Sequence, residues 1–429
     1  MIVLFIHQNF PGQYRNLVYD LAAQPGNRVF FITQPSQNSI PRVTKLVYKP
    51  DIPRKFGCHP NTIGFDLAVR NGMSVAQICR DLRGQGIVPD LIAGHAGWGE
   101  TLFVKDVFPE SPILAYFEFY YHFSDVDLGF DPEFPWHPED AFRLRTRNAV
   151  SLLSFDTADW GNTPTQWQRS LHPPELRPRI TRIHEGVDCN VVKPNAKAWI
   201  QLERAGLTLT RDDQIVTYVS RNLEPYRGFH VFMRALPEIL RRRPKARIVI
   251  VGGDDVSYGI PSPTGKSYRQ LMIDELGGEL DLNRIHFLGS VPYNVYLDIL
   301  QISSVHIYLT YPFVLSWSLI EAMASGCAII GSATPPVEEV IEDGVNGLLV
   351  DFFSIQAIAD RVDEVLDHPN LMQEMRDRAR AAAIRNFDLK TRIMPAWLQL
   401  IDDLVSHRRP SLNTPPPLKL RKRPKRSIK

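Results

Sequence analysis

The sequence of 429 residues is poor in cysteine, and several common signatures are absent from it. Its four cysteines are widely spaced and form no CxxC pair, which favours reduced thiols over a disulfide framework or a cysteine zinc site. No run approaches the roughly 20 apolar residues of a membrane helix, and the short apolar start MIVLFI does not resemble a secretory signal. We therefore expect a cytoplasmic protein that could visit the inner face of a membrane without spanning it.

Two nucleotide-binding motifs are also missing. No GxGxxG follows the first apolar run, and no GxxxxGK[ST] occurs, so dinucleotide cofactors and P-loop ATPases are poorly supported. The net charge is only +2, yet residues 408–429 carry nine Lys/Arg and no acid, which leaves 40 basic and 47 acidic residues elsewhere. We expect no nucleic-acid partner. The basic, Pro-rich tail is expected to be disordered, and either stays solvated or docks on anionic lipid.

The apolar pattern indicates two α/β domains. A single core seldom exceeds roughly 250–300 residues, so two domains are expected from the length alone. Apolar runs alternate with helical segments in each half and predict two doubly wound parallel sheets. The predicted strands are 2–7, 28–33, 90–95, 112–117, 214–220, 246–253, 284–290, 305–310 and 327–332. The predicted units are an N-terminal domain (1–190), a C-terminal domain (191–388), a last helix (389–407) and the tail (408–429).

Ligands of such sheets bind where the strands end, and the strand ends here are rich in polar groups. In SRNLEPYRG, Arg221 and Arg227 follow a predicted strand. A guanidinium matches two phosphate oxygens and could stabilise a departing diphosphate without a metal. The alternative is that both arginines merely face solvent at a helix start.

A second candidate is SWSLIEAMASG. Its helix is expected to begin near Ser316 or Ser318, where free N–H groups attract phosphate. Glu321 lies one turn further and could accept hydrogen bonds from ribose hydroxyls, or could simply stabilise its own helix dipole.

In the first half, Gly12 permits close approach of the backbone to a ligand. His95 and Glu118 lie at strand ends, and burial could raise the pKa of Glu118, as acid/base catalysis needs and as a structural, hydrogen-bonded glutamate would also show. A DxD motif, Asp125 and Asp127, could hold a divalent metal, but such pairs are common by chance, and we expect no metal or cofactor.

Taken together, these motifs resemble glycosyltransferase family 4, whose members are retaining enzymes of GT-B fold. SRNLEPYRG matches the family's Gly-Arg and Glu-Lys-Gly segment, and residues 321–351 follow the family pattern throughout. The match is close over about 210–405 and looser over 1–190, where HQNFPGQY resembles a subgroup's opening loop. The resemblance implies that the last helix crosses back to the N-terminal domain. It also implies a UDP- or GDP-linked sugar donor, and a saccharide, lipid-linked or small-molecule acceptor in polysaccharide or glycoconjugate synthesis.

The resemblance also assigns roles to residues. Arg221, Arg227 and Glu118 would be catalytic. The donor would contact Gly12, Gly253, Val291, Pro292, Leu315, Ser316, Trp317 and Glu321. On the acceptor side, His95, Tyr120 and His122 are candidates.

Three departures from the family pattern stand out. Phe313 replaces the first of the paired glutamates, with Val314 beside it where a glycine is usual. Glu118 stands where a histidine is common, and Arg227 replaces the lysine. Two alternatives therefore stay open, namely a non-catalytic nucleotide- or glycan-binding homologue and a nucleotide-sugar epimerase or hydrolase. The sequence leaves the oligomeric state undetermined.

Overall fold

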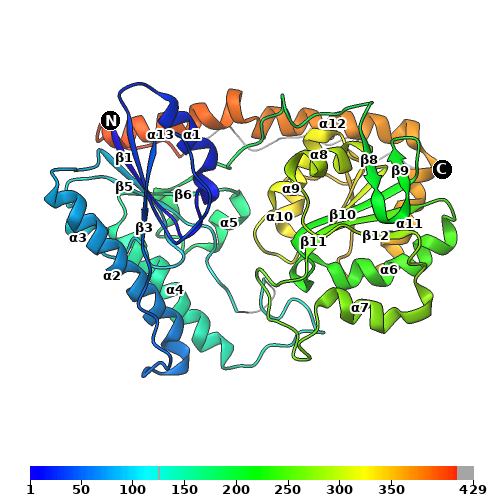
Figure 1. The fold of residues 1–429 in the computed structure, drawn as a ribbon, viewed down its shortest axis with the longest axis horizontal. Coiled ribbons are helices and arrows are strands. Elements are labelled where there is room, and N and C mark those ends of the chain that lie inside the picture. The colour runs from blue at the N-terminus through cyan, green and yellow to red at the C-terminus, as the bar shows by residue number, and fades with distance from the viewer. Residues whose placement is uncertain (124–125, 413–429) are drawn as a thin grey trace.

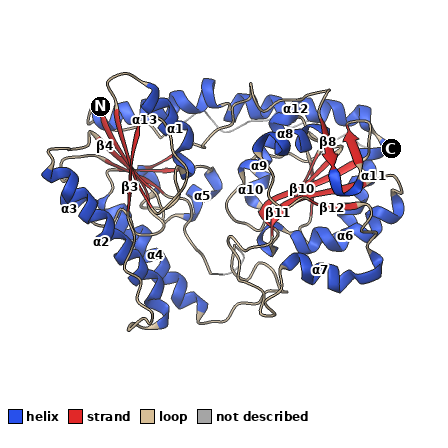
Figure 2. Cartoon of the chain, viewed as in Figure 1, coloured by secondary structure: helices blue, strands red, loops and turns tan. Residues whose placement is uncertain are grey.

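A computed structural model describes residues 1–123 and 126–412, apart from the side chain of Arg204. Two α/β halves lie side by side, each with a central sheet covered by helices (Figure 1). Coloured by secondary structure, the same view shows the strands at the centre of each half (Figure 2). The two doubly wound units predicted from the alternating pattern are confirmed.

The N-terminal half contains a seven-stranded parallel sheet in the order β3-β2-β1-β4-β5-β6-β7. Its strands are β1 (Ile2–Ile6), β2 (Arg28–Thr33), β3 (Val43–Val47), β4 (Leu91–His95), β5 (Ile113–Tyr116), β6 (Trp160–Thr163) and β7 (Ile180–Arg182). Its helices are α1 (Arg15–Ala23), α2 (Ile63–Gly84), α3 (Val104–Val107), α4 (Asp140–Thr157) and α5 (Gln166–Leu171). The four strands expected here are present, whereas β3, β6 and β7 were not predicted.

Alternate residues of the central strands enter two separate cores, because successive side chains of a strand point to opposite faces. Leu4 and Ile6 of β1 pack with α2 and α3. Val3 and Phe5 pack with α1 and with α13 (Met394–Val405), whose Trp397 is buried in this core. The last helix therefore crosses back to the N-terminal half, as predicted.

The C-terminal half contains a six-stranded parallel sheet in the order β12-β11-β10-β13-β14-β15, and the hairpin β8-β9. Its strands are β8 (Trp199–Leu202), β9 (Leu207–Thr210), β10 (Ile215–Asn222), β11 (Arg247–Gly253), β12 (Ile285–Phe287), β13 (Val305–Tyr308), β14 (Ile329–Ser332) and β15 (Leu348–Val350). Its helices are α6 (Phe229–Arg242), α7 (Tyr268–Leu276), α8 (Tyr293–Ile302), α9 (Trp317–Ser325), α10 (Pro335–Glu338), α11 (Ile355–Asp367) and α12 (Pro369–Phe387).

The arginines that end α6 join two helices. Arg242 pairs with Asp360 and Asp363 of α11, and Arg243 pairs with Asp363 and Asp367. The pairing ties α6 to α11 on one face of the sheet.

The chain connects the halves at three places. It crosses from β7 to β8 and returns through α12, a π-helical turn (Leu389–Ile393) and α13. A third connection, residues 126–135, leaves the N-terminal half after β5 and packs on the C-terminal half, and we call it the strap. Phe130 of the strap stacks on Phe353, with ring centroids 5.2 Å apart.

Of the basic tail, residues 413–429 lie outside the described residues. At its start, Arg408 pairs with Asp402 and Asp403.

Candidate active site

A cleft of about 1450 Å³ separates the two halves and is lined by residues that follow the strands of both sheets. From the N-terminal half come the segments after β1, β4 and β5, and from the C-terminal half those after β10, β11 and β13. Parallel strands deliver their C-terminal ends to one edge of a sheet, which is where α/β proteins bind ligands. The cleft is therefore the candidate site.

Both predicted arginines line this cleft, in different environments. Arg221, at the end of β10, is exposed and makes no hydrogen bond or ion pair with any described residue. Arg227 is buried, and its Nη1 donates to Thr310 Oγ1 (2.8 Å) and to the Val314 carbonyl (2.9 Å). Burial alone would lower the pKa of Arg227, but nearby Tyr308, Tyr258 and Glu224 outweigh it and raise the pKa. One wall thus holds Arg227, whose guanidinium is fixed by hydrogen bonds, and Arg221, whose side chain is exposed.

The N-terminus of α9 lies on the same wall. Ser316 is its N-cap and accepts from the Ser318 N–H (3.3 Å), as the serine-rich start predicted. Leu315, Ser316 and Trp317 all line the cleft. The Ser316 N–H, however, donates to the Tyr308 hydroxyl (2.8 Å), so this amide already has a partner within the protein.

A chain of hydrogen bonds positions Glu118 on the opposite wall. His7 Nδ1 accepts from the Asn9 N–H (2.8 Å), so Nε2 carries the proton and donates to Gln13 Oε1 (2.6 Å). Burial, and next the charge of His95, lower the pKa of His7 to about 3, which keeps this ring neutral. Gln13 Nε2 then donates to Glu118 Oε1 (2.9 Å). The loop after β1 therefore fixes the orientation of the carboxylate.

Gly12 allows this loop to close on His7. Its φ is +55°, and a Cβ atom there would lie 2.6 Å from His7 Cε1. Glycine is required on both counts, because other residues rarely adopt such a φ and no side chain fits against the ring. The glycine expected to approach a ligand also lies against the imidazole of His7.

The pKa of Glu118 is not raised, contrary to what burial alone suggested. Burial does raise it, but His95 and the hydrogen bond from Gln13 outweigh burial and lower the pKa below its ordinary value. His95 Nε2 lies 3.7 Å from Glu118 Oε2, and the His95 ring stacks on Trp98 with centroids 3.9 Å apart. The group is an ionised carboxylate, suited to meeting positive charge and not to donating a proton.

Phe313 is packed among aromatic rings. It is 4% exposed, and its ring lies 4.6 Å from Phe119, 5.3 Å from Tyr226 and 5.1 Å from Tyr258. Where the family resemblance implied a glutamate, the cleft has an apolar floor built from both halves. Donor hydroxyls can find no hydrogen-bond partner in this side chain.

Six of the residues assigned to the site from the sequence do not line this cleft. They are Gly253, Val291, Pro292 and Glu321 on the donor side, and Tyr120 and His122 on the acceptor side. Both Glu321 oxygens accept from tyrosines, Oε1 from Tyr293 and Oε2 from Tyr296, each at 2.7 Å. His122 Nε2 lies 2.6 Å from the Leu171 carbonyl, at the end of α5. The remaining eight assigned residues do line the cleft: Gly12, His95, Glu118, Arg221, Arg227, Leu315, Ser316 and Trp317.

Two glutamates of the site escaped the sequence analysis. Glu185 lies just after β7 and accepts from the Trp317 indole (3.0 Å), which joins the two walls. Glu224 is 1% exposed and accepts from three successive backbone N–H groups, those of Ser257, Tyr258 and Gly259. It thereby shapes the segment after β11 that lines the cleft. The strand-end rule did not point to Glu185, because the short strand β7 that it follows by three residues was not predicted.

Only one member of the DxD motif belongs to the described residues. Asp125 lies outside the described residues, and Asp127 is a buried residue of the cleft with 4% exposure. Burial raises the pKa of Asp127 to about 6, against the lowering effect of backbone N–H groups and Arg147.

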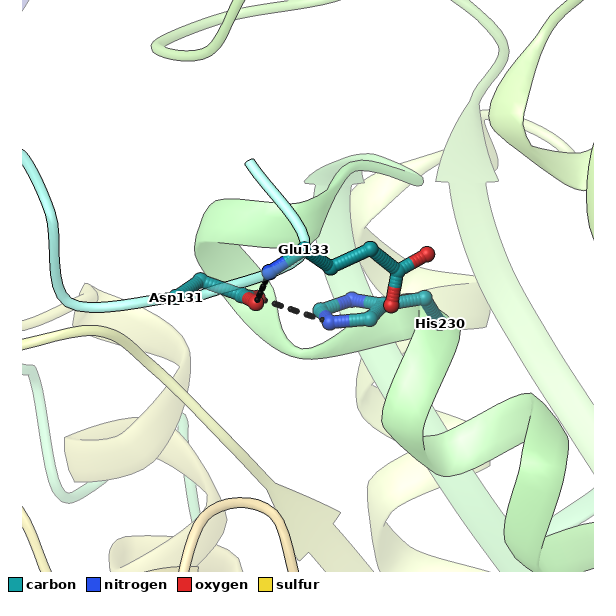
Figure 3. Close-up of side chains that lie close together, drawn as sticks. All are labelled: Asp131, Glu133 and His230. Carbon is teal, nitrogen blue, oxygen red and sulfur yellow. Dashed lines mark hydrogen bonds and ion pairs between the residues drawn. The ribbon is translucent and has the colours of Figure 1, made fainter. Parts of the chain in front are cut away.

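Further along the strap, Asp131, Glu133 and His230 lie close together (Figure 3). Asp131 Oδ2 accepts from the Tyr311 hydroxyl (2.6 Å) and lies 2.9 Å from His230 Nε2. Arg234 holds both oxygens of Glu133, at 2.6 and 2.9 Å. Because these contacts join the strap to Tyr311, His230 and Arg234, we assign the cluster to fastening the strap onto the C-terminal half.

In the described part of the chain, no helix is both long and apolar enough to cross a membrane. Comparison with known proteins gives matches over both halves. Residues 25–192 match the family described as glycosyl transferase family 4 group, and residues 201–382 match glycosyl transferases group 1.

Similar curated proteins include two D-inositol 3-phosphate glycosyltransferases. The one from Mycolicibacterium smegmatis is 29% identical over 209 residues, 48% of this chain and 44% of that protein. The one from Corynebacterium glutamicum is 28% identical over 209 residues, 48% of each chain. The match thus spans about half the length of these relatives.

Solved structures resemble the fold over nearly the whole chain. Sucrose-phosphate synthase from Thermosynechococcus elongatus has a TM-score of 0.71 at 18% identity, covering 95% of this chain and 100% of that one. Anabaena HepE in complex with UDP has a TM-score of 0.64 at 18% identity, covering 94% and 100%. With two facing Rossmann-like halves, a last helix that crosses back and family matches over both halves, the chain belongs to the family 4 glycosyltransferases of GT-B fold.

Proposed function

We propose that the chain transfers a sugar from a UDP- or GDP-linked donor to an acceptor hydroxyl, with retention of anomeric configuration and without a metal. One observation carries the proposal. A single cleft places Arg221, Arg227 and the start of α9 on one wall and the ionised Glu118 on the other. Similar proteins support it, since HepE is described in complex with UDP-glucose and the curated relatives are named as glycosyltransferases.

The arginines have separate tasks in this proposal. As the bond between the anomeric carbon and the diphosphate breaks, negative charge grows on the leaving oxygen. Arg227 is held by Thr310 and the Val314 carbonyl, so its charge is already in place and needs no reorganisation. Arg221 is exposed and closes on the diphosphate as the donor binds. The two cations take the place that a divalent metal has in other transferases.

In this proposal, Glu118 stabilises positive charge. The anomeric carbon becomes electron-poor as the leaving group departs, and an oriented carboxylate across the cleft stabilises it. Arg227 and Glu118 line the same cleft from opposite halves, and the charge of Arg227 contributes to lowering the pKa of Glu118. Because Glu118 stays ionised, the acceptor proton passes to the departing diphosphate, on the same face that the acceptor attacks. Front-face attack of this kind retains the anomeric configuration.

A thermal-shift screen with UDP, GDP, ADP and TDP, each with Mg²⁺ or with EDTA, tests the donor half of the proposal. A ligand that binds only the folded protein raises its melting temperature with occupancy. We expect stabilisation by UDP or GDP that EDTA does not remove. Arg221→Ala should weaken that stabilisation, whereas Arg211→Ala, at an exposed arginine outside the cleft, should leave it intact.

Other outcomes would redirect the assignment. No response to any nucleotide would favour a non-catalytic homologue, and a response that requires Mg²⁺ would contradict the metal-free site. Release of nucleoside diphosphate at full rate without an acceptor would indicate a hydrolase. If transfer occurs, proton NMR of the product's anomeric coupling decides between retention and inversion.

A further inference from the structure

A second cavity, of about 1620 Å³, adjoins the candidate active site. It lies between α2 and α4 of the N-terminal half and the segment 258–263 and α7 of the C-terminal half. We call it the apolar groove, because its walls are mainly carbon. The side chains that give it this character include Ile52, Ile63, Phe65, Phe134, Ile260 and Leu271.

The groove opens into the cleft. Trp98, Asp127, Arg147, Tyr226 and Tyr258 line both cavities, so a molecule lying in one can extend into the other. Ile52 and Ile260 of the groove are 58% and 70% exposed. Large apolar side chains left in water beside a reaction site indicate a ligand that covers them.

Asp127 marks the junction of the two cavities. It is 4% exposed, and its Oδ1 has no hydrogen-bond partner among the described residues. A buried carboxylate oxygen without a donor is costly, and a bound hydroxyl would supply that donor. Arg147 lies beside it, with its guanidinium 3.7 Å above the Tyr121 ring. The junction therefore offers one polar anchor at the mouth of an apolar channel.

Four carboxylates along the groove wall already have a basic partner. Glu133 and Glu275 both pair with Arg234, Asp274 pairs with Lys266, and Asp131 pairs with His230. Among the described residues of this wall, Asp127 is the one carboxylate without an ion pair, so the wall beyond the junction favours a neutral apolar occupant.

We propose that the acceptor is an amphiphile whose apolar portion lies in the groove while Asp127 holds its reacting hydroxyl at the cleft. This proposal rests on the proposed function. In the reaction, the acceptor oxygen forms a bond to the anomeric carbon, the bond from that carbon to the diphosphate breaks, and the hydroxyl proton leaves with the nucleoside diphosphate. Asp127 orients the hydroxyl and does not retain its proton.

The experiment uses the full chain, the donor that the nucleotide screen selects, and two probes with one sugar head, methyl glucoside and octyl glucoside, below micelle-forming concentration. We expect the apparent KM, read from the release of nucleoside diphosphate, to be roughly tenfold or more lower for the octyl compound. Ile260→Asp should abolish most of that difference. Leu371→Asp, at a residue 67% exposed on α12 and outside the groove, should preserve it.

The two proposals fail in different ways. If the chain neither binds nor cleaves any donor, the transferase assignment falls. If it cleaves the donor but treats methyl and octyl glucoside alike, or if Leu371→Asp acts like Ile260→Asp, the groove assignment alone falls. Asp127→Asn should lower kcat for both probes while leaving the octyl preference and nucleotide binding unchanged, and an unaltered kcat would overturn the role of Asp127.

Discussion

Replacing Asp127 by asparagine should make the protein more stable and less active. The carboxyl group is buried at the edge of the cleft, where desolvation penalises its charge and Oδ1 finds no donor among the residues that the structure describes. Asparagine has nearly the same shape without the charge. A side chain that lowers the stability of the folded protein is typical of a ligand-binding site, where function and stability make opposing demands.

The size of the expected stability difference follows from the pKa of Asp127. Burial raises the pKa of Asp127 from 3.8 to about 6, a difference worth ~3 kcal/mol. Because the folded protein holds this proton more tightly than the unfolded chain does, the contribution of Asp127 to stability falls as pH rises from about 4 to about 6. Below that window, Asp127→Asn should change the free energy of unfolding little. Above it, the variant should be more stable than the parent by up to ~3 kcal/mol.

Urea unfolding of both proteins at pH 4 and at pH 7.5 measures this difference. Asp255→Asn, an exposed carboxylate of the same cleft, is the control, and its effect should stay small at both pH values. Equal stability of Asp127→Asn and the parent at pH 7.5 would refute the argument, because a buried, poorly solvated charge could not then be present. A lower stability at both pH values would point instead to a structural hydrogen bond made by the carboxylate.

Three further predictions concern other parts of the molecule. Arg221→Ala should lower kcat by roughly 10²-fold with an unchanged melting temperature, since the side chain is exposed; a normal kcat would remove Arg221 from the mechanism. Gly12→Ala should cost about 1–3 kcal/mol in urea unfolding, because of its positive φ and the contact with His7. Gly26→Ala, with φ +86° and open space around it, measures the backbone cost alone and should cost less. Trp397→Ala should cost about 3–5 kcal/mol and speed hydrogen exchange in the strands of the N-terminal half, and unchanged exchange there would contradict the packing of α13.

The fold was largely predictable because its central strands are continuous apolar runs. Strands such as β1 and β11 are buried on both faces, and their composition alone marks them. The short strand β6 (WGNT) was missed because its buried polar residues interrupt the apolar pattern, and because contacts such as the hydrogen bond from Trp160 to Thr181 join residues far apart in the sequence. No local pattern reports such contacts.

Placement in the cleft was predictable where a residue type and its position after a strand coincide, as for Arg221, Arg227 and Ser316. The pKa of Glu118 was not, because burial and hydrogen bonding oppose each other there. The balance depends on Gln13, which is 105 positions away in the sequence. Likewise, Phe313 is visible as a departure from the family pattern, but only the structure places Phe119 of the other half against it.

The crossing of α13 has a consequence for biosynthesis. The seven strands of the N-terminal half are translated first, yet one face of their sheet is covered in part by residues 394–405. Until those residues leave the ribosome, apolar side chains such as Val3 and Phe5 lack part of their cover. The half that is made first is therefore completed last, and the nascent chain must be kept from aggregating while the whole C-terminal half is being synthesised.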